Sequence, residues 1–351
     1  ALDPENQSVV GLLEMNRAKD LDSFKAAIHK NYAPMQNVVM ADTDGNIAYQ
    51  AAGVAPKRTL HQGLYGIAPA PGWDPQYDWN GYLPFDQLPN SSNPEQGWIA
   101  TANQAVTALN NPNPLTADWD VPTRYDRIVQ LINAKSTFDL QYMKTMQGDT
   151  LSLGATPLLE LFKSSKTTHP LGSKTLDLIQ KFDGNMSVDS PGALIFNAWA
   201  DHLTRNVFSR LSYLFFDDYG ARNFRYPLIA ILQNPNNPWC DLPKTPALET
   251  CAESSNIALD RALEYLSDQY GKDPASWAWG KAHIAISEHR PLSKIPVLGK
   301  LFNVTTPFPG DSFSINVGRL ELNNSSNPYE TLQGPSLRAI YDLSDLEKSL
   351  F

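Results

Sequence analysis

The 351-residue sequence has few cysteines, no long apolar run and no concentration of basic residues. It lacks a stretch of about 18 apolar residues, so it predicts no membrane span. Lysine and arginine number 28 against 37 aspartates and glutamates, and they form no basic stripe, which argues against a nucleic acid partner. The net charge is −9 and 42% of the residues are hydrophobic, which is typical of a globular chain with a large core.

Several familiar catalytic and metal-binding motifs are also missing. The sequence contains no G-x-S-x-G elbow, no phosphate-binding P-loop and no G-x-G-x-x-G pattern. Its six histidines form no H-E-x-x-H motif. His283 and His289 lie six residues apart, and on a helix this spacing would place their rings on opposite sides. We therefore expect these histidines to be structural.

Two aspartates offer the strongest candidate metal ligands. Asp118 and Asp120, in the sequence A-D-W-D, could hold a calcium ion together with loop carbonyls. The favoured interpretation is helix capping or an ion pair with Arg124 or Arg127. We therefore expect no cofactor, with a structural calcium ion as the alternative.

The two cysteines provide evidence about the cellular compartment of the protein. Cys240 and Cys251 are separated by several prolines, and their spacing matches no zinc or redox motif. The prolines and a helix start after Thr250 favour a closed loop, and hence a disulfide and a periplasmic or secreted protein. The alternative is a pair of buried thiols in a cytosolic protein.

Hydrophobic periodicity predicts the regular structure. Residues 53–97 are rich in Gly, Pro, Trp and Asp and carry little regular pattern, and a loop of this length is usually functional. A hairpin is expected over residues 37–52, with its turn at 44–46. The expected helices are residues 8–30, 122–133, 191–217 and 252–270.

The order of elements predicts an α+β fold, and residues 1–351 are expected to form one continuous portion of that fold. Residues 1–135 should supply the sheet and active-site loops, residues 136–310 a mainly helical part, and residues 311–351 the returning strands. Within the last part, strands are expected at residues 313–317 and 336–341.

The stretch from residue 93 to residue 124 is the most informative for function. Asn103 is predicted to end a short apolar strand, residues 97–102. An uncharged carboxamide can donate an N–H to a developing anionic oxygen, which is what an oxyanion hole requires. The alternative is an asparagine that caps a turn.

The motifs around Asn103 resemble those of the penicillin acylase family of N-terminal-nucleophile (Ntn) hydrolases. Residues 79–85 read W-N-G-Y-L-P-F, residues 93–99 read N-P-E-Q-G-W-I, and Asn103 follows them. Further segments occur in the family's order over nearly the whole chain. Four of them, residues 239–251, 277–283, 296–299 and 334–338, look closer to the acyl-homoserine lactone and aculeacin acylase branch than to penicillin G acylases. These further segments are 44–49, 182–184, 191–199, 239–251, 277–283, 296–299 and 334–338.

This resemblance implies an Ntn-hydrolase αββα sandwich with helical insertions, here as an interior portion of the β-chain. It implies that Asn103 belongs to the oxyanion hole of an acylase for linear amides, which works through an acyl-enzyme. Arg124 would support it by orienting the Asn103 loop or by meeting a substrate carboxylate; the alternative is a helix-surface arginine. Met35 and Val39, on the strand before the D-G-N turn, would face the acyl group; the alternative is plain sheet core.

The family's nucleophile, a serine at the start of the β-chain, has no counterpart at Ala1. We therefore expect the nucleophile on another polypeptide. The partners would be the rest of the acylase, namely its α-chain and the β-chain segment with the nucleophile, and a small-molecule amide. Two functions stay open: a penicillin or acyl-homoserine lactone acylase, and a catalytically silent structural or binding subunit that keeps the fold.

Overall fold

The computed structural model describes residues 3–58, 64, 67–108, 110–211, 221–243, 245–320 and 327–350. The chain forms two compact units. One comprises Ala1–Val129 together with Ala339–Phe351, and the other comprises Gln130–Arg338.

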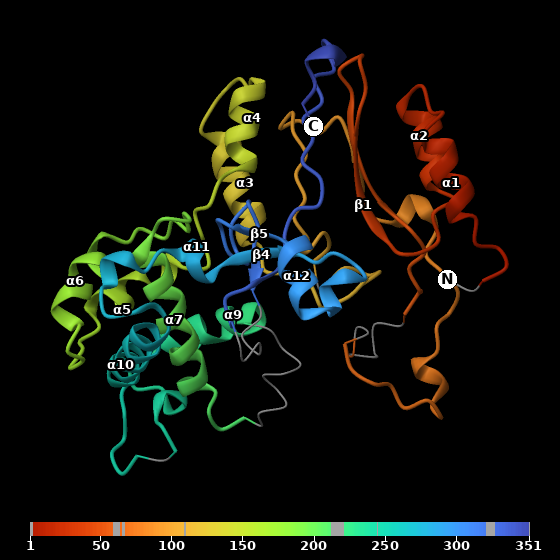
Figure 1. Ribbon diagram of the computed structural model, residues 1–351. Coiled ribbons are helices and arrows are strands. Elements are labelled where there is room, and N and C mark those ends of the chain that lie inside the picture. The colour runs from red at the N-terminus through yellow and green to blue at the C-terminus, as the bar shows by residue number, and fades with distance from the viewer. Residues whose placement is uncertain are drawn as a thin grey trace. The chain divides into compact units, whose positions relative to one another are not determined.

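The first unit begins with two short helices that lie side by side along a β-hairpin (Figure 1). They are α1 (Ser8–Met15) and α2 (Leu21–Ile28). The continuous helix expected over residues 8–30 is therefore wrong. The break arises at Asp20, whose carboxylate accepts a hydrogen bond from the Ser23 backbone N–H at 2.8 Å and starts a new helix with a capping box.

The hairpin is present as predicted. Strands β1 (Gln36–Ala41) and β2 (Ile47–Ala52) pair antiparallel, and β3 (Asn90–Ser92) adds to β2, giving the order β1-β2-β3. At the turn, the Asp42 carboxylate accepts hydrogen bonds from the backbone N–H groups of Asp44 and Asn46, at 3.1 and 2.8 Å. Gly45 has φ +87°, a conformation that glycine adopts without strain.

The two faces of the hairpin pack differently. Met40, Ala48 and Ala52 are buried against Ile28 of α2. The opposite face, which includes Ala51, packs against residues of the long loop that follows. That second small core contains Ala51, Ala55, Leu83 and Leu88.

The segment that leads to Asn103 is not a strand. Residues 97–102 run as irregular chain without a ladder partner, so the predicted apolar strand is wrong. The long loop over residues 53–97 carries the 3₁₀ turns η2 (Pro75–Tyr77) and η3 (Phe85–Gln87). The helix expected over residues 122–133 is confirmed as α3 (Thr123–Asn133).

The second unit is built around helix α7 (Pro191–Val207). Ser190 caps it by accepting a hydrogen bond from the Ala193 N–H at 3.1 Å, and Pro191 occupies its first position. The helix ends ten residues earlier than the predicted 191–217, and residues 212–217 lie outside the described residues. Its main partner is α10 (Cys251–Tyr270), which stops at Gly271 as expected.

Aromatic rings fill the space around α7. Phe162 contacts Phe182, Phe196 and Trp199 with ring centroids 5.0 to 6.2 Å apart, a spacing typical of edge-on and tilted aromatic pairs. Other helices complete this unit. They are α4 (Leu140–Gln147), α5 (Leu159–Ser164), α6 (Gly172–Lys181), α9 (Ala221–Leu232), α11 (Trp279–Ala282) and α12 (Pro296–Phe302).

A small mixed sheet lies in the same unit with the order β5-β4-β7-β6. Its strands are β4 (Ile284–Ser287), β5 (Val304–Pro307), β6 (Arg319–Leu320) and β7 (Thr331–Gln333). The strands predicted at residues 313–317 and 336–341 are wrong. Around the first, the Ser314 hydroxyl accepts a hydrogen bond from the Asp311 N–H and the Asp311 carboxylate accepts one from the Phe313 N–H, so the backbone curls into turns.

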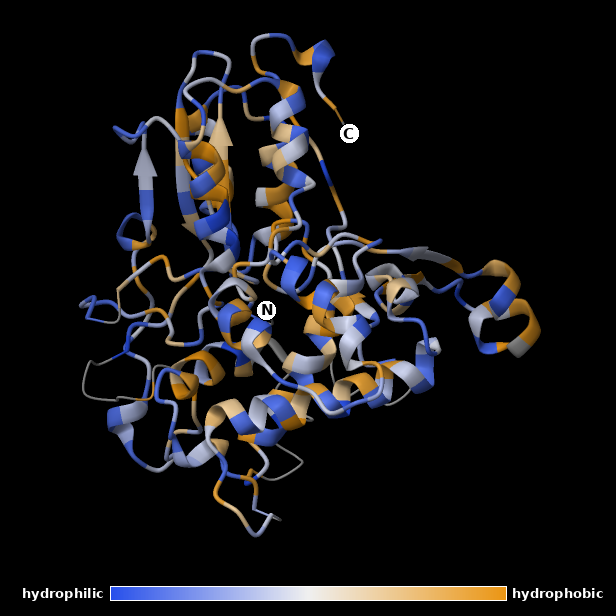
Figure 2. Cartoon of the chain, turned by 90° about the vertical axis from the view of Figure 1, so that its left-hand side faces the viewer, coloured by the Kyte–Doolittle hydropathy of each residue, from blue (hydrophilic) through white to orange (hydrophobic). Residues whose placement is uncertain are grey.

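Figure 2 shows hydrophobic and hydrophilic residues interspersed along the helices. In the part of the chain that the structure describes, no helix combines the length and the apolar character that crossing a membrane requires.

Candidate active site

Asn103 lies in an exposed loop of the first unit with a left-handed backbone, φ +69°. Among residues with a side chain, asparagine is one of the few that tolerate this conformation. The loop before it is anchored because the Gln104 side-chain carbonyl accepts a hydrogen bond from the Ala102 N–H at 2.7 Å. The carboxamide of Asn103 is thus carried on a short, braced turn and not on a strand end.

Arg124 holds the Asn103 side chain. Its Nη2 donates to the Asn103 Oδ1 at 2.9 Å and to the Asp120 Oδ2 at 3.0 Å. Because a guanidinium only donates hydrogen bonds, the Asn103 atom that faces it must be the carbonyl oxygen. The Nδ2 group occupies the other branch of the carboxamide, and it meets no acceptor in the part of the chain that the structure describes.

The start of α3 positions Arg124. The helix begins at Thr123, so Arg124 stands in its first turn and reaches back over the preceding loop. The side chains of Arg124 and Asp120 are only 15% and 9% exposed, so their ion pair is largely shielded from water. Arg124 therefore contacts both Asn103 and Asp120, and its supporting role in catalysis stays a prediction.

Met35 and Val39 lie on the hairpin face that points away from α1 and α2. Met35 directly precedes β1 and packs in the small core around Ala51. Val39, within β1, is 48% exposed, and its cross-strand partner is Tyr49. The place of Met35 and Val39 in an acyl pocket stays a prediction.

A cavity of about 360 Å³ lies beside Tyr49. Because cross-strand partners stand on the same face of a sheet, Tyr49 and Val39 share the face on which this cavity opens. Val106 and Thr107, just after Asn103, form part of its wall. Burial raises the pKa of Tyr49 to about 12, so its hydroxyl stays neutral. No sequence motif pointed to this cavity.

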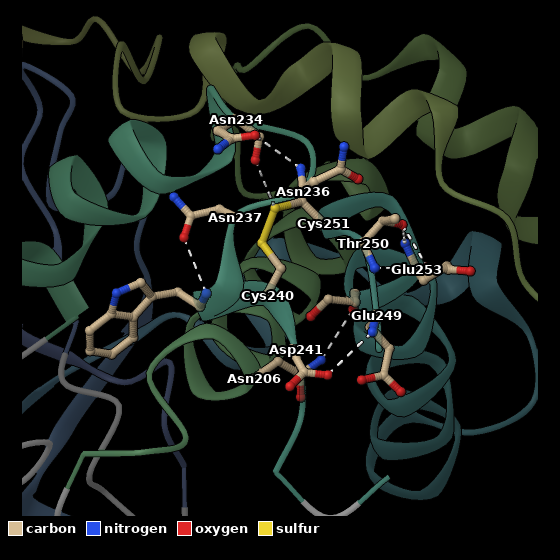
Figure 3. Close-up of a disulfide and its surroundings, with 12 residues drawn as sticks. Asn206, Asn234, Asn236, Asn237, Cys240, Asp241, Glu249, Thr250, Cys251 and Glu253 are labelled. Atoms are coloured by element: carbon tan, nitrogen blue, oxygen red, sulfur yellow. Dashed lines mark hydrogen bonds between the residues drawn. A yellow bond between two sulfur atoms is a disulfide. The ribbon is translucent and has the colours of Figure 1, made fainter. Parts of the chain in front are cut away.

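The cysteines form the predicted disulfide. The Cα atoms of Cys240 and Cys251 are 4.9 Å apart, and Figure 3 shows the bond where the first residue of α10 meets a preceding turn. The Cys251 N–H also donates to the Pro235 carbonyl at 2.8 Å. At the start of α10, Thr250 and Glu253 cap each other reciprocally. The described residues contain no free cysteine.

The histidine pair is not a metal site. His283 is buried at the end of α11, stacks on Trp279 and hydrogen-bonds the Tyr329 carbonyl through Nδ1 at 2.7 Å. Burial lowers its pKa to about 4. A strand, β4, separates it from the exposed His289, so the helical-spacing argument does not apply to these two residues. A structural role for both histidines stays a prediction.

The two candidate calcium ligands, Asp118 and Asp120, lie in different surroundings. The Asp120 carboxylate is paired with Arg124, as the favoured interpretation held, and Asp118 is exposed two residues earlier. Within the described ranges no group of three or more His, Cys, Asp or Glu side chains could hold a metal ion. Because loop carbonyls can also bind calcium, a structural calcium ion at these aspartates stays a prediction.

Sequence comparison places these observations in a family. A profile described as penicillin amidase matches residues 1–351. The acyl-homoserine lactone acylase QuiP of Pseudomonas aeruginosa is 27% identical over 377 residues, which covers 97% of this chain and 43% of that protein. The penicillin acylase 2 proenzyme of Pseudomonas sp. SE83 is 24% identical and covers 89% of this chain and 39% of that protein. The chain thus spans less than half the length of these curated relatives.

A solved structure supports the same conclusion. The thermostable penicillin G acylase from Alcaligenes faecalis superposes with a TM-score of 0.60 at 18% identity, over 86% of this chain and 59% of that one. This likeness confirms the predicted α+β, Ntn-hydrolase fold. With a profile match along its whole length, the chain belongs to the penicillin amidase family.

Proposed function

We propose that this chain is part of an acylase that hydrolyses a linear amide, and that Asn103 donates to the oxyanion. The observation that carries the proposal is the hydrogen bond from Arg124 to the Asn103 Oδ1. It fixes which way the carboxamide faces and leaves Nδ2–H as the outward donor. An exposed, uncharged donor held in one orientation suits the stabilisation of a negatively charged oxygen.

The proposed reaction passes through an acyl-enzyme. The nucleophilic oxygen of Ser or Thr, or the sulfur of Cys, attacks the amide carbonyl carbon, and the carbonyl oxygen becomes an oxyanion that accepts a hydrogen bond from the Asn103 N–H. The C–N bond then breaks, the amine leaves with the proton of the nucleophile, and water hydrolyses the ester or thioester to release the acid and restore the nucleophile. We assign the nucleophile, an N-terminal Ser, Cys or Thr, and its base to a part of the acylase outside residues 1–351. The proposed partners are that remaining part of the acylase, including its α-chain.

The acyl group is proposed to lie against the hairpin face that carries Met35 and Val39. The half-exposed Val39 and the neighbouring cavity beside Tyr49 support this assignment. Because Val106 and Thr107 bound the same cavity, the loop after Asn103 is also part of its wall.

The preferred substrate is proposed to be a long-chain acyl-homoserine lactone, with penicillins as the second candidate. The named relatives include acylases of both kinds. Cleavage of the amide bond in an acyl-homoserine lactone would quench quorum signalling, and cleavage of the side-chain amide in a penicillin would act on an antibiotic. A panel of penicillin G, penicillin V and homoserine lactones with acyl chains of several lengths distinguishes them. Faster cleavage of penicillin G than of every longer acyl chain would contradict our preference.

We propose that the protein is located in the periplasm or the extracellular space. It would reach this compartment as a zymogen, before processing. The disulfide between Cys240 and Cys251 supports an oxidising environment.

The proposal is tested with two substitutions in the complete enzyme. Asn103→Ala removes the donor, and Asn103→Asp keeps the shape and the left-handed backbone while replacing the donor with an acceptor. We expect each to lower kcat by about 10²- to 10³-fold, the usual loss for one oxyanion donor. Unchanged kcat in correctly folded protein would refute the role of Asn103.

Asn93 provides the matched control. It is another asparagine with a left-handed backbone, φ +43°, and its side chain bonds the Ile47 N–H and Asn46 at the hairpin end. Asn93→Asp should affect stability but leave kcat within about twofold. Intact-mass analysis of the native complex tests the alternative. If no polypeptide of the native protein begins with Ser, Cys or Thr, the chain belongs to a silent structural subunit.

A further inference from the structure

Asp120 contacts both residues of the candidate oxyanion site. Its Oδ2 accepts a hydrogen bond from the Arg124 Nη2 at 3.0 Å, and its own backbone N–H donates to the Asn103 carbonyl at 3.1 Å. The same Arg124 nitrogen donates to the Asn103 Oδ1. Asp120, Arg124 and Asn103 therefore close a ring of three hydrogen bonds.

The ring restricts Arg124. An arginine side chain has several rotatable bonds and five N–H donors, so a single contact to a neutral amide would not select one rotamer. The Asp120 carboxylate adds a charge-assisted hydrogen bond, which is stronger than a neutral one. Both side chains are largely shielded from water, so solvent screens the pair less than an ordinary surface ion pair.

The ring also restricts the Asn103 backbone. The hydrogen bond from the Asp120 N–H holds the Asn103 carbonyl while the residue is in its left-handed conformation. Main chain and side chain of Asn103 are therefore fixed by one neighbouring segment, residues 120–124. A shift of that segment would move the carboxamide as a whole.

We propose that Asp120 is a positioning residue of the acylase site, which sets the orientation of the Asn103 carboxamide through Arg124. This inference rests on the proposed function, because it assigns a role to Asp120 only if Asn103 donates to the oxyanion. Asp120 itself touches no reacting atom. The negative charge of Asp120 also pairs with the positive charge of the Arg124 guanidinium. Arg124 therefore acts as an oriented hydrogen-bond donor and not as an unpaired charge beside the nucleophile.

If the role of Asp120 is purely structural, its substitution should have a different effect. Asp120 precedes α3 by three residues, and its Oδ1 accepts the Val121 N–H at 2.8 Å, so it could serve only to start the helix. In that case, its substitution would lower stability and leave kcat per folded molecule unchanged. The effect would also be independent of Arg124.

The experiment is a double-mutant cycle in the complete enzyme. Asp120→Asn, Arg124→Gln and the double variant are assayed with N-decanoyl-homoserine lactone and penicillin G, and the faster substrate is used throughout. We expect Asp120→Asn to lower kcat by about 10- to 100-fold with KM changed less than about twofold, as for a misplaced catalytic donor. The double variant should be no slower than Arg124→Gln alone, because Asp120 acts through Arg124.

Two further variants complete the test. Asp118→Asn is the matched control, since Asp118 is exposed and two residues away, and it should leave kcat unchanged. Asp120→Glu should recover part of the lost kcat by restoring the carboxylate, and it replaces Asp120→Asn if that variant does not fold.

The outcomes separate this inference from the proposed function. If Asn103→Asp lowers kcat as expected, the positioning role would be overturned by an unchanged kcat in Asp120→Asn. A loss in Asp120→Asn that adds fully to that of Arg124→Gln would overturn it as well. An active Asn103→Asp enzyme would instead overturn the proposed function and the positioning role with it.

Discussion

The indole Nε1 of Trp199 donates a hydrogen bond to the Ser255 Oγ at 3.1 Å, and this contact joins α7 to α10 inside the second unit. The Ser255 hydroxyl also meets the Ser165 hydroxyl at 2.6 Å. Ser255→Ala would leave two buried polar groups with fewer partners, so we expect it to lower the free energy of unfolding by about 1–3 kcal/mol. Urea unfolding followed by fluorescence measures this change.

The neighbouring Ser254 is the control for that substitution. It is equally buried, but its hydroxyl has no hydrogen-bond partner in the described part of the chain. Removing an unpaired buried hydroxyl costs nothing in hydrogen bonding, so Ser254→Ala should be neutral or stabilising. Equal destabilisation by the two variants would show that packing, and not the Trp199 contact, sets the effect.

The buried histidine gives a pH dependence of known sign. His283 has a pKa of about 4 when folded, below its ordinary value of 6.5, so between these values the unfolded chain binds the additional proton. Its contribution to stability is therefore present above pH 6.5 and is lost as the pH falls toward 4. Asp201, whose pKa is raised by burial to about 6, acts in the opposite direction over part of that range.

Urea unfolding at pH 7, 5.5 and 4.5 tests this expectation. In His283→Asn, the decrease in stability over that range should be shallower than in the unsubstituted protein, because one source of proton uptake is gone. An identical pH slope in both proteins would mean that His283 does not titrate differently on folding.

The disulfide should stabilise the second unit. The cysteines are 11 positions apart, and closing a loop of this length contributes about 3 kcal/mol in the chain-entropy estimate. The double variant with alanine at Cys240 and Cys251 should lose about that much stability. Thiol labelling of denatured, unreduced protein from its native compartment should detect no reactive cysteine; two labelled thiols would contradict both the bond and the proposed export.

The acyl assignment is tested by filling the space beside the hairpin. Val39→Trp adds a large side chain to a half-exposed position opposite Tyr49, and Met35→Trp does so at the strand entrance. Both should shift the preferred acyl chain to shorter lengths without changing recognition of the amine. Val38→Trp, on the opposite hairpin face, is the control for altered stability. An unchanged chain-length profile would assign Met35 and Val39 to the sheet core.

Local chemistry explains which elements the sequence could predict. The D-G-N turn and the Gly271 stop depend on a few adjacent residues, so their signals are readable without the rest of the fold. The apolar segment 97–102 has the composition of a strand but no ladder partner. Residues 313–317 alternate like a strand, yet side chains of Asp311 and Ser314 bind the local backbone instead. Such competition depends on contacts that a periodicity pattern does not contain.

The sequence also predicts some of the residues of the candidate site but not all of their contacts. Family motifs indicate Asn103 and Arg124. The sequence leaves helix capping or an ion pair with Arg124 or Arg127 open for the two aspartates, and the structure has the pair of Asp120 with Arg124. The second role of Asp120, a backbone hydrogen bond to Asn103, follows from the left-handed turn at Asn103. That turn brings together residues 17 positions apart, and neither motif nor spacing encodes it.

The burial of α7 has a consequence for how the second unit opens. Of its 17 residues, 14 are buried, so the helix has almost no face of its own toward water. Such a helix cannot unfold locally while its neighbours stay in place, since its release would expose the packed faces of α6 and α10 as well. Its backbone amides should therefore exchange with deuterium only through the largest cooperative opening of the unit, later than those of the short helices α4 and α12.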